Sequence, residues 1–197
     1  RSSLVTGVQT CALPISMSWN IVSNNFAFTS PFTNSQQIAG HPGGYWECSI
    51  DLPLLDQQQA RLMSSFIHSL HGMMGTFRLY PWNRRPAPAA GIGVVDGGGQ
   101  AGGQLVTRDW TPSKTVLRRG DYITVSGQLL EVLEDVTSNA EGQAVITIAP
   151  WLRVPPANGT AINYQAPYAV MRLTEEGAES SYQGIIGSAS LSCREAF

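Results

Sequence analysis

The sequence contains only one lysine, Lys114, and only 13% of its 197 residues are charged. Twelve Lys and Arg residues against 14 Asp and Glu residues give a formal net charge of −2 at pH 7. Because affinity for nucleic acids comes largely from neutralising phosphates, we expect no nucleic-acid partner. The chain also lacks an apolar run of about 20 residues, which a membrane-spanning helix needs, so we expect no membrane segment.

Sequence motifs of common active sites are missing too. No GxSxG motif marks a nucleophilic serine, and the cysteines are not in the CxxC spacing of a thiolate metal site. Gly91–Gly103 is rich in glycine, but it follows a proline-rich stretch, precedes a β pattern, and no GK[ST] follows. We therefore interpret it as a mobile surface loop, or a loop at a subunit contact, rather than a phosphate site.

The remaining polar residues do not form a recognisable constellation. His68 and His71 are three residues apart, a spacing that can hold a metal, but no acid stands at a matching offset, and His41 lies in a loop. Serines and acids occur in turn-like contexts or at strand ends (Ser126, Ser138, Ser180, Ser181, Asp96, Asp109, Asp121 and Glu141). We expect no catalytic, cofactor-binding or metal-binding residues, no cofactor, and no enzymatic activity.

The first 16 residues are predicted to be a non-native artefact. Polar residues interrupt the stretch too often for a secretory signal. Residues 5–15, VTGVQTCALPI, instead resemble one translated reading frame of a short-read sequencing adapter, and Met17 then follows as a natural start. Without Arg1, eleven basic residues stand against 14 acidic ones, a net charge of −3. We expect residues 1–16 to make few contacts with the rest of the chain.

Removing that segment removes Cys11 and leaves Cys48 and Cys193. Both occupy apolar positions of alternating segments, which predicts small buried thiols. A disulfide between them requires their strands to be neighbours. The sequence alone leaves that pairing open.

Two segments of the first half have clear periodicity. In WECSIDL, Trp46, Cys48, Ile50 and Leu52 alternate with polar residues, which predicts a half-buried strand. A helix is predicted next. Asp56 would cap its first turn, the Gln59 side chain would bond back to Asp56, and Gly72 or Gly75 would end the helix. Its apolar stripe comprises Ala60, Met63, Phe66, Ile67, Leu70 and Met74. TFRLY, residues 76–80, then predicts another strand.

The second half predicts short strands joined by turns. GDYITVSGQLLEVLEDV reads as two strands around a tight turn at Ser126–Gly127, and QAVITIAP as a third. YAVMRL and SASLSCREA form two closing strands, the latter with Ala189, Leu191 and Cys193 on one face. NGT at 158–160 fits the glycosylation pattern but is interpreted as a turn.

These patterns predict a mainly β protein with one α-helix: a β-sandwich-like, tail-tube-type domain carrying an inserted small β-barrel. Residues 17–85 and 168–197 would form the sheet-and-helix domain, and residues 86–167 the inserted β module. The aromatics Trp82, Trp110, Trp151 and Tyr164 would serve as buried anchors or interface residues, or alternatively as an exposed sugar-stacking platform.

Three stretches together resemble tail proteins of long-tailed bacteriophages, in the tail-tip class that includes distal tail proteins. They are WECSIDLPLLDQQQARLMSSFIHSLHGMMGTFRLYPW, VLRRGDYITVSGQLLEVLEDVTSNAEGQAVITIAPWLR, and the closing YAVMRLT with SASLSCREAF. The resemblance implies a structural virion protein, assembled in the host bacterial cytoplasm into a hexameric or trimeric ring. Other tail proteins (tube, hub or fibre) would be its partners.

Two further functions stay open at this point. A carbohydrate- or receptor-binding β module of a phage tail is the main alternative, and it depends on the tryptophans and the inserted barrel. A tail-associated hydrolase of the cell wall is the third. The ring order, the neighbouring proteins and the host do not follow from the sequence.

Overall fold

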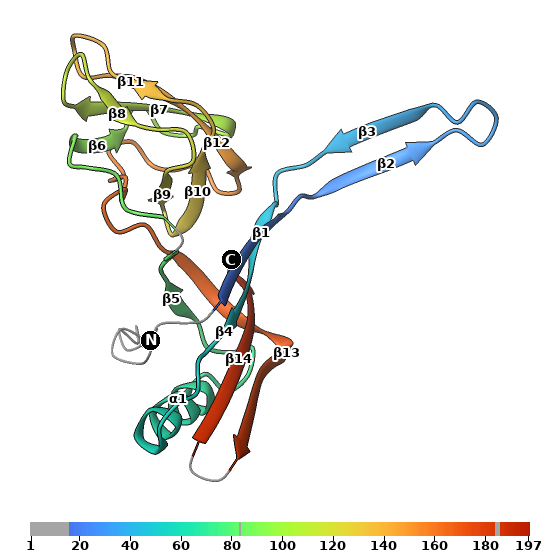
Figure 1. Ribbon diagram of the computed structural model, residues 1–197. Helices are drawn as coiled ribbons and strands as arrows, with labels where there is room; N and C mark the ends of the chain where they lie inside the picture. Colours follow the sequence, from blue (N-terminus) through green and yellow to red (C-terminus); the bar gives the residue numbers. More distant parts are fainter. Residues whose placement is uncertain (1–15, 83, 184–185) are drawn as a thin grey trace. The chain divides into compact units, whose positions relative to one another are not determined.

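A computed structural model describes residues 16–82, 84–183 and 186–197, with side chains for all of these except 175–187. The fold is mainly β with a single described α-helix, as predicted, and its sheets are consistent with a β-sandwich-like fold (Figure 1). None of its described helices is long and apolar enough to span a membrane. Predictions about residues 1–15 lie outside the described residues, whereas Ser16 already belongs to the first strand.

The described residues divide into two compact units. The first comprises residues 16–20, 46–82, 168–183 and 186–197, and the second comprises residues 21–45 and 84–167. The sequence-based division differs, because it assigned residues 21–45 to the first unit. Gly44 explains the difference: its carbonyl accepts a hydrogen bond from Arg153 at 3.0 Å, which ties the end of this segment to the second unit.

The first unit is a five-stranded sheet in the order β1-β4-β14-β13-β5. Its strands are β1 (Ser16–Val22), β4 (Tyr45–Asp51), β5 (Phe77–Leu79), β13 (Ala169–Gln183) and β14 (Ile186–Glu195). The predicted alternation in β4 is confirmed, because Trp46, Cys48 and Ile50 are buried and the residues between them are not. Ala189, Leu191 and Cys193 of β14 are also buried together, as expected.

The helix α1 (Gln57–Ser69) begins as its sequence predicts. The Asp56 carboxylate accepts from the Gln59 N–H at 2.8 Å, and the Gln59 side chain accepts from the Asp56 N–H at 3.1 Å. The predicted stripe is wrong at Met74, which is 86% exposed. The helix ends before that residue because His71 and Gly72 both take positive φ angles and turn the chain away.

Cys48 and Cys193 face each other across β4 and β14, so their strands are neighbours. Both thiols are buried and free, and the Cys193 thiol donates to the Cys48 carbonyl at 3.3 Å. A hydrogen bond with Cys193, burial and the Cys193 charge all raise the pKa of Cys48 above its usual value. A thiol held in the protonated form is a poor nucleophile, so Cys48 contributes packing rather than reactivity.

The second unit contains a five-stranded sheet in the order β6-β7-β12-β10-β9. Its strands are β6 (Gly91–Val95), β7 (Gly102–Trp110), β9 (Tyr122–Val125), β10 (Gln128–Val132) and β12 (Ala144–Leu152). Isolated bridges from Val94 to Ala161 and from Thr124 to Asn163 connect both edge strands to one segment. We call this curled sheet, with the segment that bridges its edges, the barrel. A small ladder of β8 (Thr115–Leu117) and β11 (Val136–Thr137) accompanies it.

The barrel core is apolar because its strands alternate. Every second residue of β12 from Ala144 to Leu152 is buried, and the neighbouring strand β7 contributes Leu105, which pairs with Ile146 and is also completely buried. The predicted turn between β9 and β10 is confirmed, since Ser126 and Gly127 both have positive φ, as a tight hairpin requires. Tyr164 donates its hydroxyl to the Gly91 carbonyl at 2.6 Å and closes the core at one end.

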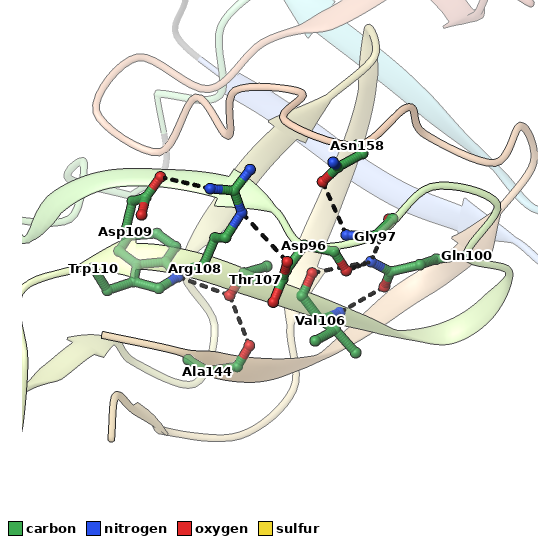
Figure 2. Close-up of polar contacts among 10 residues, drawn as sticks. All are labelled: Asp96, Gly97, Gln100, Val106, Thr107, Arg108, Asp109, Trp110, Ala144 and Asn158. Carbon is green, nitrogen blue, oxygen red and sulfur yellow. Dashed lines mark hydrogen bonds and ion pairs between the residues drawn. The ribbon is translucent and has the colours of Figure 1, made fainter. Parts of the chain in front are cut away.

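The glycine-rich stretch, interpreted above as a mobile loop, forms strands at both of its ends instead. β6 pairs with the second half of β7, from Thr107 to Trp110. The Gln100 side chain holds the turn between the two strands (Figure 2). The Gln100 amide donates to the carbonyls of Asp96, Gly97 and Val106, and its oxygen accepts from the Val106 N–H at 2.6 Å. A side chain of the turn itself thus satisfies backbone groups around it, and composition alone does not reveal this.

Two glycines, Gly93 within this stretch and Gly142 outside it, leave room for Trp110. The indole N–H donates to the Thr107 hydroxyl at 2.7 Å, and that hydroxyl donates to the Ala144 carbonyl at 2.7 Å (Figure 2). A Cβ on Gly93 would lie 2.6 Å from Cε2 of the indole and closer still to two other ring atoms. A Cβ on Gly142, which has φ +75°, would lie 2.5 Å from the Trp110 carbonyl oxygen. Both positions therefore need glycine.

Candidate functional site

A two-stranded hairpin, which we call the arm, gathers several exposed large apolar side chains in one element. Its strands are β2 (Asn25–Thr29) and β3 (Gln36–Gly40), and they pair only with each other (Figure 1). All ten strand residues are exposed. An isolated two-stranded hairpin is only marginally stable in water, so a surface of this kind needs a packing partner.

Apolar side chains stand on both faces of the arm. Phe26 and Phe28 lie on one face and are 68% and 63% exposed, while Ile38 lies opposite Ala27 and is 66% exposed. Exposed aromatic groups gathered in one element mark interaction sites more often than single scattered residues do. No Asp, Glu, Lys or Arg occurs between Met17 and Trp46, so the arm recognises its partner without formal charge.

The loop at the end of the arm, residues 30–35, is ordered by its own hydrogen bonds and is called the tip. The Ser30 N–H donates to the Ser35 carbonyl at 2.9 Å, and the Asn34 N–H donates to the Ser30 carbonyl at 3.0 Å. The Thr33 and Ser35 hydroxyls share a further bond of 2.8 Å. This closed loop holds Phe32 outward, where 96% of it is exposed.

At the other end of the arm lies a cavity of about 360 Å³, which we call the base groove. It is lined by Ile21, Ser23, Asn24, Asn25, Gly40, His41, Gly44, Ala149, Pro150 and Trp151. All of these residues belong to the second unit. The lining contains no carboxylate, Lys or Arg, so the groove suits a neutral or apolar group.

The walls of the base groove are held in place from behind. The Gln128 side chain, which is buried, donates to the Trp151 carbonyl at 2.9 Å and accepts from the Arg153 N–H at 3.1 Å. The Trp151 indole lies on Gly103, where a Cβ would come within 3.1 Å of Nε1. On the opposite wall, Arg153 holds Gly44. The Trp151 indole is thus 47% exposed and yet supported.

The three histidines lie in different local settings. His68 is exposed in the last turn of α1, and His71 is exposed just beyond it with φ +50°. His41 instead lines the base groove, within the second unit. Among the residues that the structure describes, no group of three or more His, Cys, Asp or Glu could hold a metal ion.

The serines and the asparagine weighed above occupy structural positions where the structure describes them. Ser138 is buried and donates to the Lys114 carbonyl at 3.2 Å, and Ser126 forms the β9–β10 turn. Ser180 and Ser181 lie in β13, and their side chains are outside the described part. Asn158 lies in an exposed turn, and its side chain accepts from the Gly97 N–H at 3.0 Å.

The acids have local partners as well. The Arg108 guanidinium lies 3.3 Å from the Asp96 carboxylate and 3.4 Å from that of Asp109 (Figure 2). Asp121 accepts from the Arg118 N–H at 2.7 Å, and Glu141 lies in the turn that Asn139 orders. These contacts fix strand ends and turns, and each fits the context that the sequence indicated.

Two of the four aromatics of the predicted sugar platform are buried. Trp110 and Tyr164 are buried and contact each other with ring centroids 5.2 Å apart and ring planes tilted by 53°, so the anchor interpretation holds for them. Trp82 and Trp151 are exposed, but they belong to different units. Only Trp151 lines the base groove.

The arm and the base groove were not predicted from the sequence. A signal was present, because FAFT carries aromatic residues at alternate positions and SPFTNS is rich in turn residues. No family model matches the sequence, and no curated protein shows a significant match to it.

Proposed function

We propose that this protein is a structural component of a phage tail, which assembles into a ring at or near the tail tip. The arm is the observation that carries the proposal, because its uncharged, doubly apolar surface requires a protein neighbour. The sequence pattern of a strand, a glycine-terminated helix and a strand supports the tail class. A closed ring of identical subunits gives each arm such a neighbour.

In this role the protein acts without enzymatic chemistry, as a connector within the virion. Six or three copies form the ring, and tail proteins such as the tube, hub or fibre proteins contact it. Assembly takes place in the host bacterial cytoplasm, where free thiols such as Cys48 and Cys193 persist.

The direct test is the oligomeric state of the purified chain with and without the apolar face of the arm. We expect the wild type to form a ring of defined mass, and the variant Phe26→Ser/Phe28→Ser to be monomeric at micromolar concentration. Losing two buried aromatic contacts per interface would weaken association by several orders of magnitude, at about 1.5–3 kcal/mol for each side chain. Light scattering coupled to size-exclusion chromatography measures both masses.

A matched control replaces two equally exposed apolar residues outside the arm. Leu54→Ser/Met74→Ser removes side chains that are 70% and 86% exposed, and it should keep the wild-type mass. Far-UV circular dichroism checks that all variants are folded. A wild type that stays monomeric at high concentration would count decisively against a ring-forming protein.

One observation favours a second candidate, a carbohydrate-binding module of a phage tail. The supported, half-exposed indole of Trp151 lies beside Ser23, Asn24 and Asn25, and an aromatic face with neutral hydrogen-bonding groups suits an uncharged saccharide. On a broad glycan array, this candidate predicts saturable binding that Trp151→Ala reduces at least tenfold. A flat response of the wild type across the array would eliminate it.

A further inference from the structure

The tip and the base groove lie at opposite ends of the same arm. Asn25 lines the groove, whereas Phe32 stands beyond the far end of β2. Five strand residues at about 3.3 Å each separate them by roughly 16 Å. Because β2 is paired along its length with β3, the arm cannot bend Phe32 back into the groove of its own chain.

The two features fit each other in size and in chemical character. Cavities of about 150 Å³ in other proteins accept benzene, and the base groove offers about 360 Å³ with walls of Ile21, Pro150 and Trp151. Phe32 is almost completely exposed and its loop is already ordered, so inserting it costs little conformational entropy. Its ring would meet the Trp151 indole, and aromatic pairs attract in offset or edge-on arrangements.

Charge and hydrogen bonding are also compatible. Neither the tip nor the groove lining carries a carboxylate, Lys or Arg, so no charge would be buried in the contact. His41 is the one titratable side chain of the lining. Ser23, Asn24 and Asn25 can bond to the main-chain groups of an inserted loop, which would otherwise lose their water.

We propose that the base groove of each protomer receives Phe32 from the arm of a second copy of this chain. The contact joins one surface of a protomer to a different surface of its neighbour, and such head-to-tail contacts generate rings when the rotation closes. This inference rests on the proposed ring assembly and specifies the contact that forms it.

Two complementary variants test the contact. Phe32→Ser removes the aromatic side chain of the tip but keeps the groove, whereas Trp151→Ser damages the groove but keeps the tip. Each variant alone is expected to lose the ring, with a dissociation constant at least 100-fold higher than that of the wild type. An equimolar mixture should form dimers with one copy of each, because one intact tip and one intact groove remain. Mass photometry distinguishes monomers, dimers and rings.

Two further variants guard against loss of folding. Ser23→Arg places a charge in the groove at an exposed position and should mimic Trp151→Ser, and Met74→Ser removes an exposed apolar side chain elsewhere and should leave the ring intact. Circular dichroism of each variant confirms the fold.

The possible outcomes separate this inference from the ring proposal. A wild type without a ring would overturn both. A ring that survives Phe32→Ser and Trp151→Ser would overturn the tip-in-groove contact and leave ring assembly standing. A mixture of the two variants that stays monomeric would also contradict the contact. Glycan binding that is lost in Trp151→Ser, with the ring retained, would assign the groove to a saccharide instead.

Discussion

Replacing Gly93 with alanine is expected to lower the free energy of unfolding of the barrel by about 3 kcal/mol, the upper end of the cost of overpacking. The added methyl group would occupy the same space as the Trp110 ring. The ring cannot move away cheaply, because its N–H is bonded to Thr107, which is itself bonded to Ala144. Urea unfolding followed by circular dichroism measures the change.

Gly98 provides the matched control, since it lies in the same glycine-rich stretch. A Cβ there would come no closer than 3.4 Å to its nearest neighbour, the backbone nitrogen of Asn158, which is an ordinary van der Waals contact. Gly98→Ala should therefore change the unfolding free energy by less than about 0.5 kcal/mol. Equal unfolding midpoints for both variants would show that Trp110 does not pack on Gly93 as described.

Truncating Ile146 should lower the free energy of unfolding by a similar amount, because it leaves a cavity instead of overpacking the core. Ile146 is completely buried in the barrel core, and Ile→Ala at such a site leaves a cavity that typically costs about 2–5 kcal/mol. Its neighbour Val145 points outward and is 53% exposed, so Val145→Ala should cost less than about 1 kcal/mol. The comparison uses adjacent residues of one strand, and reversed costs would mean that the register of β12 is shifted by one residue.

The elements predicted correctly are those whose signal is local. The alternation of Trp46, Cys48 and Ile50 needs only the period of a strand, and the Asp56 cap needs only the four residues that form it. Such patterns depend on residues that are neighbours in sequence, so they can be recognised without knowing the long-range contacts of the chain.

The structure of Gly91–Gly103, which the sequence-based interpretation missed, depends on contacts between residues that are distant in sequence. Glycine there looks like flexibility, but Gly93 is glycine because Trp110 fills the space of its side chain. Gln100 then orders the turn with four hydrogen bonds. The same limit applies to the base groove, which needs Asn25 and Trp151 to meet, although more than 100 residues separate them in the sequence.

The absence of formal charge from Met17 to Trp46 determines how the proposed assembly would respond to its surroundings. Dissolved ions screen only charges, so raising the ionic strength would give no means of separating the subunits at this contact. Apolar burial, in contrast, weakens on cooling and under urea. A ring held by this arm would therefore withstand molar salt and loosen in the cold, the reverse of a ring held by ion pairs.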